Sequence, residues 1–293
     1  MQSITNSTRR QFVSTVAAGS LALAGARNTK AKSPDRIPVG LELYSVRHEL
    51  EKDPSGTLQR VAQIGYDCVE FYSPYAEWTP EHAKEVRQQL DTLKLRCYST
   101  HNGIESFTGD GLSKAIELNQ ILGAHYIVLA HPGDSVKTVD QWKEIADTLN
   151  QANTKMQSAG LHAGYHNHDV EWKPVDGQKP IEIIASNTQK SVMLQLDVGT
   201  CLETGNDPVA WINANPGRIK SLHLKEWTPD GGYKVLFGEG KAPWKQIFAA
   251  AEKRGGVEFY LIEQEGSRFP EFETAERCLV AYKDLRSGTK ANS

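Results

Sequence analysis

Short runs of apolar residues recur along the chain at intervals of roughly 30 residues, the usual length of one strand–helix unit. Each run is followed by a stretch in which apolar residues repeat every three or four positions, the pattern of an amphipathic helix. The runs predict eight strands, which begin near Val39, Tyr66, Arg96, Tyr126, His162, Met193, Lys220 and Phe259. The stretches between them predict helices, among them Pro80–Leu93, Leu112–Leu122, Val139–Ser158, Ile181–Ser186, Pro208–Asn213 and Pro243–Arg254.

Regular alternation of strands and helices indicates an α/β fold with a parallel sheet. Eight such units are enough to close the sheet, so we expect a single (β/α)8 TIM barrel. A doubly wound open sheet is the competing architecture, but it places a glycine-rich phosphate loop after its first strand. Residues 41–47, where that loop would begin, contain no glycine. No linker-like stretch divides the chain, and we assign residues 27–293 to one barrel domain.

Residues 1–26 have the pattern of an export signal rather than of a folded element. Arg9 and Arg10 precede Phe12 and an apolar stretch that is too short to span a bilayer. The small residues at 24–26 suit cleavage by a signal peptidase. The segment resembles a twin-arginine (Tat) signal. It predicts a periplasmic or extracellular protein that keeps no membrane anchor after processing.

Charge and composition exclude several classes of partner. The formal net charge is −3 and no basic run follows the signal segment, which argues against a nucleic-acid surface. Hydrophobic residues make up 39% of the chain, yet no apolar segment after the signal is long enough to cross a membrane. We therefore expect a small-molecule substrate as the partner, and both a monomer and a homo-oligomer fit the sequence.

Four predicted strands in the C-terminal half end in residues that can bind a divalent metal. The carboxyl ends of barrel strands meet at one mouth, so these residues are expected to share one ion. Two imidazoles and two carboxylates suit Mn²⁺, Zn²⁺, Co²⁺ or Fe²⁺ better than Ca²⁺, which prefers oxygen alone. Carboxylates without thiolates favour Mn²⁺. The segments are AGYHNHD, MLQLDVG, SLHLKE and YLIEQE, and the candidate ligands are His166, Asp197, His223 and Glu263.

Side chains two residues apart on a strand point to the same face, so candidate ligands have companions at the mouth. His168 accompanies His166, and Lys225 accompanies His223. Ligation would occupy the lone pair of His166, which leaves His168 as a free acid or base. Lys225 is expected to bind a substrate oxygen or to stabilise developing negative charge. A second interpretation keeps His166 away from the ion, with Asn167 or His168 nearer to it.

Together these segments resemble the sugar phosphate isomerase/epimerase superfamily, the xylose-isomerase-like TIM barrels, over the whole chain after the signal. In that family one residue from each of the last four strands binds a divalent metal, normally Glu, Asp, His and Glu. His166 departs from this pattern, because it stands where many members have glutamate. The matching segments are VGLELYSVR, IGYDCVEFY, STHNG, YHNHD, LQLDVG, SLHLKEW with FGEGKAPW, and LIEQE.

The resemblance also implies roles for other residues. Glu42, Glu70 and His101 lie at the ends of the first three predicted strands and resemble the family's substrate-side residues. Glu263 is implied as a base as well as a ligand. Trp227, an aromatic residue just beyond the seventh predicted strand, is a further candidate for stacking against a sugar ring.

These features predict a metal-dependent isomerase or epimerase that removes a proton next to a carbonyl, with the metal stabilising the enediolate. Export favours an unphosphorylated sugar or keto-sugar, since sugar phosphates are cytoplasmic. A lyase or dehydratase on the same scaffold is the alternative, for example one that eliminates from a 3-keto-glycoside or a keto-polyol. His166 makes it a close alternative, because the two-glutamate proton exchange of the family's epimerases is unavailable. A multi-metal nuclease and a catalytically inactive sugar-binding barrel agree less well with these residues.

Overall fold

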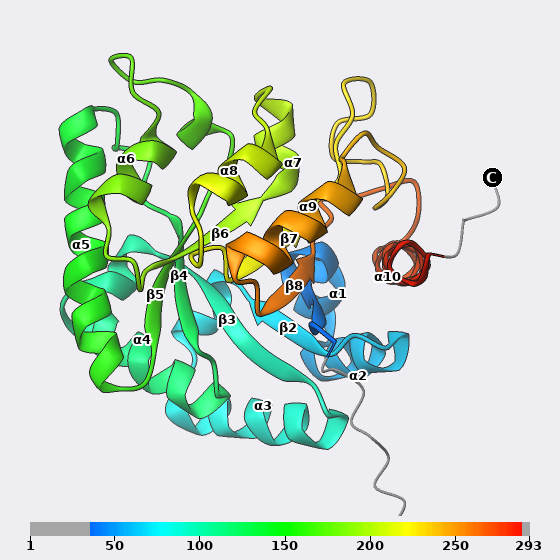
Figure 1. Ribbon diagram of the computed structural model, residues 1–293. Coiled ribbons are helices and arrows are strands. Elements are labelled where there is room, and N and C mark those ends of the chain that lie inside the picture. The colour runs from blue at the N-terminus through cyan, green and yellow to red at the C-terminus, as the bar shows by residue number, and fades with distance from the viewer. Residues whose placement is uncertain (1–35, 289–293) are drawn as a thin grey trace, which may run out of the picture. The chain divides into compact units, whose positions relative to one another are not determined.

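The computed structural model describes residues 36–288 and contains a closed barrel of parallel strands surrounded by helices (Figure 1). Each strand pairs with the next in the chain, and β1 pairs with β8 to close the ring. The expected (β/α)8 TIM barrel is confirmed. The strands are β1 (Val39–Glu42), β2 (Cys68–Phe71), β3 (Arg96–Gly103), β4 (Tyr126–His131), β5 (His162–His166), β6 (Met193–Asp197), β7 (Ser221–Leu224) and β8 (Phe259–Ile262).

Helices follow the strands and cover the outside of the barrel (Figure 1). The α-helices are α1 (Arg47–Lys52), α2 (Pro54–Ile64), α3 (Pro80–Leu93), α4 (Gly109–Leu122), α5 (Val139–Ser158), α6 (Pro180–Asn187), α7 (Val198–Glu203), α8 (Pro208–Ala214), α9 (Trp244–Ala250) and α10 (Glu271–Ser287). Shorter turns are the 3-10 helices η1 (Leu43–Val46), η2 (Ser73–Glu77), η3 (Ile104–Phe107) and η4 (Val170–Trp172), and the π-helical turn η5 (Ala251–Gly255). Within residues 36–288, no helix combines the length and apolar character needed to cross a bilayer. The predicted signal, residues 1–26, lies outside the described residues.

Most predicted element boundaries agree with the structure. Six strands begin at the predicted residue, and α3 and α5 match the prediction at both ends. Strand β2 begins two residues later than predicted, at Cys68. Tyr66 lies before the strand instead and donates a hydrogen bond from its hydroxyl to the carbonyl of Ala275 in α10, at 2.8 Å.

Local side chains fix where the helices begin. Thr79 caps α3 because its hydroxyl accepts the backbone N–H of His82, and Pro80 occupies the first turn. Thr138 and Gln141 form a reciprocal capping box at the start of α5. Such caps fix the residue at which the loop ends and the helix begins.

The barrel interior is closed below the mouth by a layer of apolar side chains. Cys68, Met193 and Leu261 belong to a buried cluster and share the inner strand faces with the polar residues two positions later. A Cβ on Gly40 would lie 2.5 Å from the sulfur of Cys68, and one on Gly164 would lie 2.9 Å from Cγ of Met193. Glycine on β1 and β5 therefore makes room for larger side chains from β2 and β6. This packed layer is the floor beneath the polar residues at the carboxyl ends of the strands.

Candidate metal and catalytic site

The four candidate metal ligands meet at the carboxyl ends of β5–β8. His166 and Asp197 end β5 and β6, His223 lies in β7, and Glu263 directly follows β8. Each offers one potential ligand atom, and these atoms all lie within 4.8 Å of one another. All four residues are buried. The barrel thus collects two imidazoles and two carboxylates in a space suited to one ion, and their role as ligands stays a prediction.

His166 and Asp197 face each other without a hydrogen bond. Nε2 of His166 lies 3.9 Å from Oδ2 of Asp197, which is too far for one. This oxygen accepts no hydrogen bond, although Nζ of Lys225 lies 3.3 Å away. The other oxygen of Asp197 accepts the backbone N–H of Thr200 at 2.9 Å and caps α7. Because a buried carboxylate oxygen without a donor is costly, this arrangement fits a bound cation.

His223 is held between two carboxylates. Its Nδ1 lies 2.7 Å from Oε2 of Glu263, and its Nε2 lies 2.7 Å from Oε2 of Glu70. Burial alone would lower the pKa of His223, but the hydrogen bonds with Glu263 and Glu70 raise it to about 10. The imidazole therefore carries a proton on both nitrogens at neutral pH. A metal ion has to displace one of those protons before it can bind here.

Glu70 on β2 gathers donors from several strands. It accepts hydrogen bonds from the hydroxyl of Ser99 and, at 3.0 Å, from the amide of Gln195, and Nε2 of His101 lies 3.1 Å away. Burial by itself would raise the pKa of Glu70, but the imidazoles of His101 and His223 and the hydroxyl of Ser99 together lower it. Glu70 is therefore an ionised carboxylate that ties β2 to the imidazoles of β3 and β7.

Lys225 balances part of the negative charge. Its Nζ lies 3.3 Å from Asp197 and 3.5 Å from Glu263, and it forms an ion pair with Glu265. Burial would lower the pKa of Lys225, but these three carboxylates raise it well above its usual value. Burial would likewise raise the pKa of Glu263, but Lys225 and His223 outweigh it and lower the value. The site thus holds a fixed ammonium group next to an ionised Glu263.

The pKa of Glu42, at the end of β1, is shifted in the direction opposite to that of Glu263. It is buried; its Oε1 has no hydrogen-bond partner, and its Oε2 accepts the backbone N–H of Tyr44. Burial, followed by repulsion from Glu263 and Glu70, raises the pKa of Glu42 well above its usual value. Two carboxyl groups of one buried cluster, Glu42 and Glu263, therefore differ in acidity, since the pKa of the first is raised and that of the second is lowered.

The remaining expected site residues lie at different distances from this cluster. The ring of His101 is 4.5 Å from that of His166 and 5.0 Å from that of His223. The ring of His168 is 4.9 Å from that of His166, and His168 also lines a cavity of about 440 Å³ formed by the loops after β4 and β5. Trp227 is half-buried in the loop after β7. His101 therefore lies among the candidate ligands, whereas His168 stands beside them.

Gln195 is a site residue that the search for ligands, acids and bases passed over. It lies in β6 two residues before Asp197, so strand alternation places both side chains on the inner face. Its buried amide lies 2.7 Å from His101, 3.0 Å from His166 and 3.0 Å from Glu70. Strand alternation, which placed His168 with His166 and Lys225 with His223, also places Gln195 with Asp197. Gln195 was passed over because an amide does not titrate and is not one of the expected ligand types.

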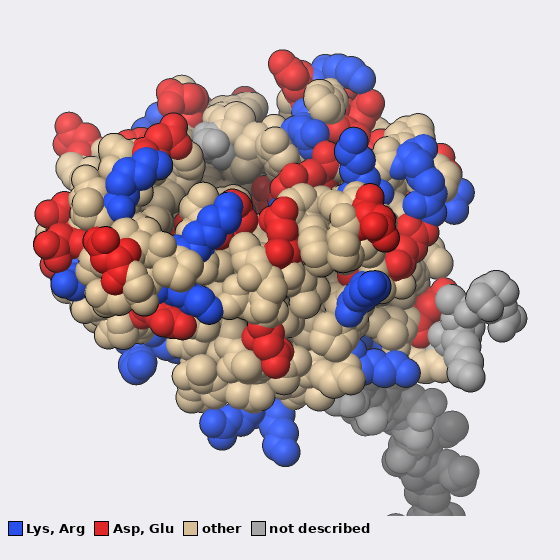
Figure 2. All heavy atoms as spheres, turned by 90° about the horizontal axis from the view of Figure 1, so that it is seen from above, with Lys and Arg blue, Asp and Glu red and all other residues tan. Residues whose placement is uncertain are grey.

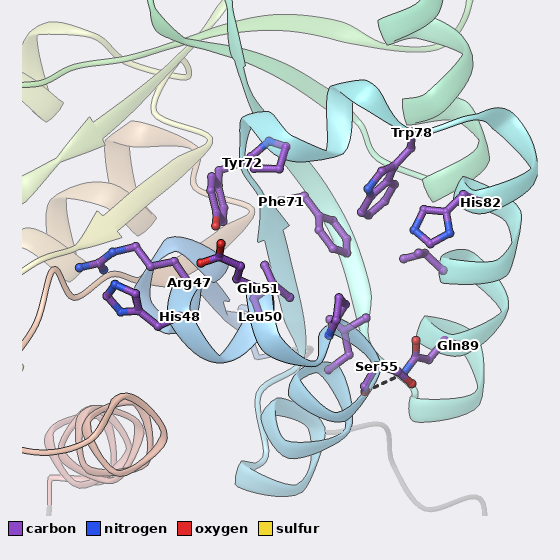
Figure 3. A pocket seen from close by; sticks show the side chains of 14 residues that line it. Arg47, His48, Leu50, Glu51, Ser55, Phe71, Tyr72, Trp78, His82 and Gln89 are labelled. Atoms are coloured by element: carbon purple, nitrogen blue, oxygen red, sulfur yellow. Dashed lines mark hydrogen bonds between the residues drawn. The ribbon is translucent and has the colours of Figure 1, made fainter.

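A separate apolar groove of about 660 Å³ lies on the outer side of β2 (Figure 3). Arg47 and His48 of α1 lie on one side of it, and Trp78 and His82 on the other, with Phe71 between them (Figure 3). None of its lining residues belongs to the charged cluster described above. We therefore assign no part of the chemistry to this groove.

The surface view gives no sign of a polyanion-binding face. Lys and Arg side chains are interspersed with Asp and Glu on the face shown in Figure 2. A nucleic-acid surface would instead gather basic side chains into one patch or stripe. On this face, the charge distribution agrees with the expectation of a small-molecule substrate.

Comparison with known proteins identifies the family to which the chain belongs. Residues 58–281 match the family model described as Xylose isomerase-like TIM barrel. An inosose dehydratase from Clostridium beijerinckii is 30% identical over 129 residues, which cover 39% of this chain and 43% of that protein. An inosose dehydratase from Lacticaseibacillus casei is 24% identical over 247 residues, which cover 71% of this chain and 80% of that protein.

A solved structure extends the similarity across the barrel. The crystal structure of a sugar phosphate isomerase/epimerase from Parabacteroides distasonis has a TM-score of 0.71 and 26% sequence identity to this chain. The match covers 86% of this chain and 96% of that one. The family model itself spans β2–β8. The chain therefore belongs to the xylose isomerase-like TIM barrel family.

Proposed function

We propose that the protein is a metal-dependent lyase that eliminates water or an alcohol from a keto-sugar or keto-polyol. The proposal is carried by Glu42 and Glu263, buried at the ends of the paired strands β1 and β8, where the pKa of Glu42 is raised and that of Glu263 is lowered. Elimination needs a base at one carbon and an acid at the oxygen that leaves the next, and carboxyls with separated pKa values supply both. The sequence favoured an isomerase. The Glu42–Glu263 pair and the similarity to two inosose dehydratases favour the lyase instead.

In the proposed reaction, Glu263 removes a proton from the carbon next to the substrate carbonyl. The electron pair forms a C=C bond as the C–O bond at the neighbouring carbon breaks, and Glu42 gives its proton to the departing oxygen. The ammonium group of Lys225 stabilises the negative charge that develops on the carbonyl oxygen. The products are an unsaturated ketone and water or an alcohol. Proton transfer from Glu263 back to Glu42 through solvent restores the starting state.

His166, Asp197, His223 and Glu263 are the residues proposed to hold the metal ion. The support is the unsatisfied Oδ2 of Asp197 opposite the imidazole of His166. A divalent ion in this position supplies Lewis-acid polarisation of the substrate carbonyl. Mn²⁺ fits the carboxylates best, and Zn²⁺, Co²⁺ and Fe²⁺ fit the mixed ligand set as well. Metal analysis of the purified protein is expected to find about one ion per chain.

Metal binding is expected to release at least one proton and to strengthen as the pH rises. His223 has a pKa of about 10 in the metal-free site, so below that pH an ion competes with a proton for its nitrogen. The apparent Kd for Mn²⁺ should fall about tenfold per pH unit between roughly pH 7 and 9. Isothermal titration calorimetry in buffers of different ionisation enthalpy measures the protons released. A pH-independent Kd with no proton release would contradict the assigned protonation of His223.

An isomerase or epimerase is the second candidate, because the same base begins both reactions. The Parabacteroides distasonis protein of similar fold, a sugar phosphate isomerase/epimerase, favours it. In this case His168, beside His166, is proposed as the acid that returns a proton to the substrate carbon. His101 and Trp227 are proposed to contact the sugar in either reaction, and Glu70, whose Oε2 lies 3.1 Å from Nε2 of His101, is proposed to orient that ring.

Incubation with unphosphorylated keto-sugars and keto-polyols in D₂O separates the two reactions. The lyase proposal predicts an unsaturated ketone together with released water or alcohol, which NMR spectra of the mixture would show. The isomerase instead predicts an intact sugar that carries deuterium on the carbon next to the carbonyl. Deuterated, intact sugar as the main product would overturn the lyase proposal and support the second candidate.

We propose further that residues 1–26 direct Tat export and that residues 27–293 act in the periplasm or outside the cell. The support is the sequence pattern around Arg9 and Arg10. A location where sugar phosphates are scarce agrees with an unphosphorylated substrate. Cell fractionation of wild type against an Arg9→Lys, Arg10→Lys protein tests export, and periplasmic recovery of both would argue against it.

A further inference from the structure

The orientation of the Gln195 side chain follows from its buried neighbours. One end of its amide faces Oε1 of Glu70 at 3.0 Å. An ionised carboxylate only accepts hydrogen bonds, so this end must be the NH₂ group. The carbonyl oxygen at the other end faces Nε2 of His101 at 2.7 Å and Nδ1 of His166 at 3.0 Å. The amide therefore presents its acceptor to two imidazoles at once.

A carbonyl oxygen cannot donate, so each imidazole nitrogen that faces it must carry the hydrogen. His166 is thereby held with its proton on Nδ1, which leaves the lone pair of Nε2 pointing towards Oδ2 of Asp197, 3.9 Å away. His101 is held with its proton on Nε2, and Oε2 of Glu70 also lies 3.1 Å from that nitrogen. The Nδ1 of a neutral His101 then keeps its lone pair.

We propose that Gln195 is a positioning residue that fixes the tautomers of His166 and His101 through one carbonyl oxygen. This inference rests on the proposed metal site and explains how a histidine serves in place of the glutamate expected there. A carboxylate can bind an ion through either oxygen, whereas a neutral imidazole binds only through the nitrogen without hydrogen. Outer hydrogen bonds that select the tautomer of a histidine ligand typically change metal affinity by about 10–100-fold.

The consequence for His101 is separate from metal binding. With its proton on Nε2, His101 offers Nδ1 as an acceptor for a substrate hydroxyl. The ring is 12% exposed, whereas the side chain of His166 is 2% exposed. His101 is therefore the more accessible of the two imidazoles that Gln195 orients. The amide of Gln195 thus orients His166 to bind the ion and His101 to accept a hydrogen bond from the substrate.

The test combines NMR with calorimetry on the whole purified protein. Long-range ¹H–¹⁵N spectra of the metal-free, ¹⁵N-histidine-labelled protein should show His166 protonated on Nδ1 and His101 on Nε2. In Gln195→Leu, which lacks the acceptor, His166 should lose this preference, and the Kd for Mn²⁺ should rise about 10–100-fold. Gln195→Glu keeps an acceptor oxygen and should retain the tautomers even where the added charge alters stability.

Ser221→Ala is the matched control. The hydroxyl of Ser221 lies 3.4 Å from the nitrogen of the same amide, so this change touches Gln195 and spares both imidazole contacts. It should leave the tautomers and the Mn²⁺ affinity unchanged. A His166 protonated on Nε2 in the wild type, or Gln195→Leu spectra and affinity equal to wild type, would overturn the proposal. The expected tautomers without any metal binding would instead refute the metal-dependent function and leave the tautomer assignment standing.

Discussion

Asp197→Asn is expected to abolish tight binding of a divalent ion and to lower the turnover rate by at least about 1000-fold. The amide removes the negative charge from the position of Oδ2, the oxygen that no hydrogen-bond donor satisfies. Loss of a Lewis acid costs several kcal/mol of transition-state stabilisation, and about 1.4 kcal/mol corresponds to tenfold in rate. Asparagine can still accept the Thr200 N–H that caps α7, so the fold should survive. Metal analysis, circular dichroism and steady-state kinetics check the three expectations.

Asp207→Asn provides the matched control. Asp207 is also an N-cap aspartate, accepting from the backbone N–H groups of Val209 and Ala210 at the start of α8. It lies outside the four-residue cluster. The same chemical change there should leave metal content and turnover close to wild type. An Asp197→Asn protein that keeps a full complement of metal would show that the ion binds elsewhere.

Lys225→Met is expected to destabilise the metal-free protein by about 3–5 kcal/mol, the usual cost of removing one partner from a buried ion pair. Lys225 is 1% exposed and contacts Asp197, Glu263 and Glu265, so its loss leaves buried carboxylates without their cation. For a domain of this size the Tm should drop on the order of 10 °C. Saturating Mn²⁺ should recover part of the loss, since an ion that binds only the folded state stabilises it. Thermal unfolding with and without Mn²⁺ measures both effects.

Lys220→Met is the control for the Lys225 experiment. Lys220 pairs with Glu258 at 3.1 Å, but both side chains are partly exposed, and such pairs contribute about 0–1 kcal/mol. Its Tm should therefore stay near that of wild type and should respond to Mn²⁺ as wild type does. Equal Tm values for the two lysine variants would mean that Lys225 does not neutralise the buried carboxylates.

Much of the barrel could be predicted because strands and helices depend on neighbours within a few residues. Apolar runs predicted six strand starts and both ends of α3 and α5, and in the structure Thr79 and Thr138 cap these two helices. The floor of the barrel could not be predicted in the same way. Gly40 and Gly164 are required by side chains from neighbouring strands, and that requirement depends on register and barrel radius rather than on local pattern.

The sequence by itself determined the fold class and placed His166, Asp197, His223 and Glu263 at strand ends. Strand alternation makes such placement local, since two residues separate side chains on one face. Only the tertiary structure decided which side chains form hydrogen bonds with these groups. Glu70 reaches His223, and Gln195 reaches His101, across strands that are far apart in the chain.

The difference in pKa between Glu42 and Glu263 was also decided by the tertiary structure alone. Glu42 and Glu263 are the same residue type at the ends of two paired strands, and no local sequence pattern indicates that their pKa values differ. Burial and neighbouring carboxylates raise the pKa of Glu42, whereas Lys225 and His223 outweigh burial and lower the pKa of Glu263. The pKa of a side chain depends on desolvation and nearby charge, which exist only once the chain has folded. The sequence therefore named Glu42 and Glu263 as candidate site residues, and the folded environment separates their pKa values.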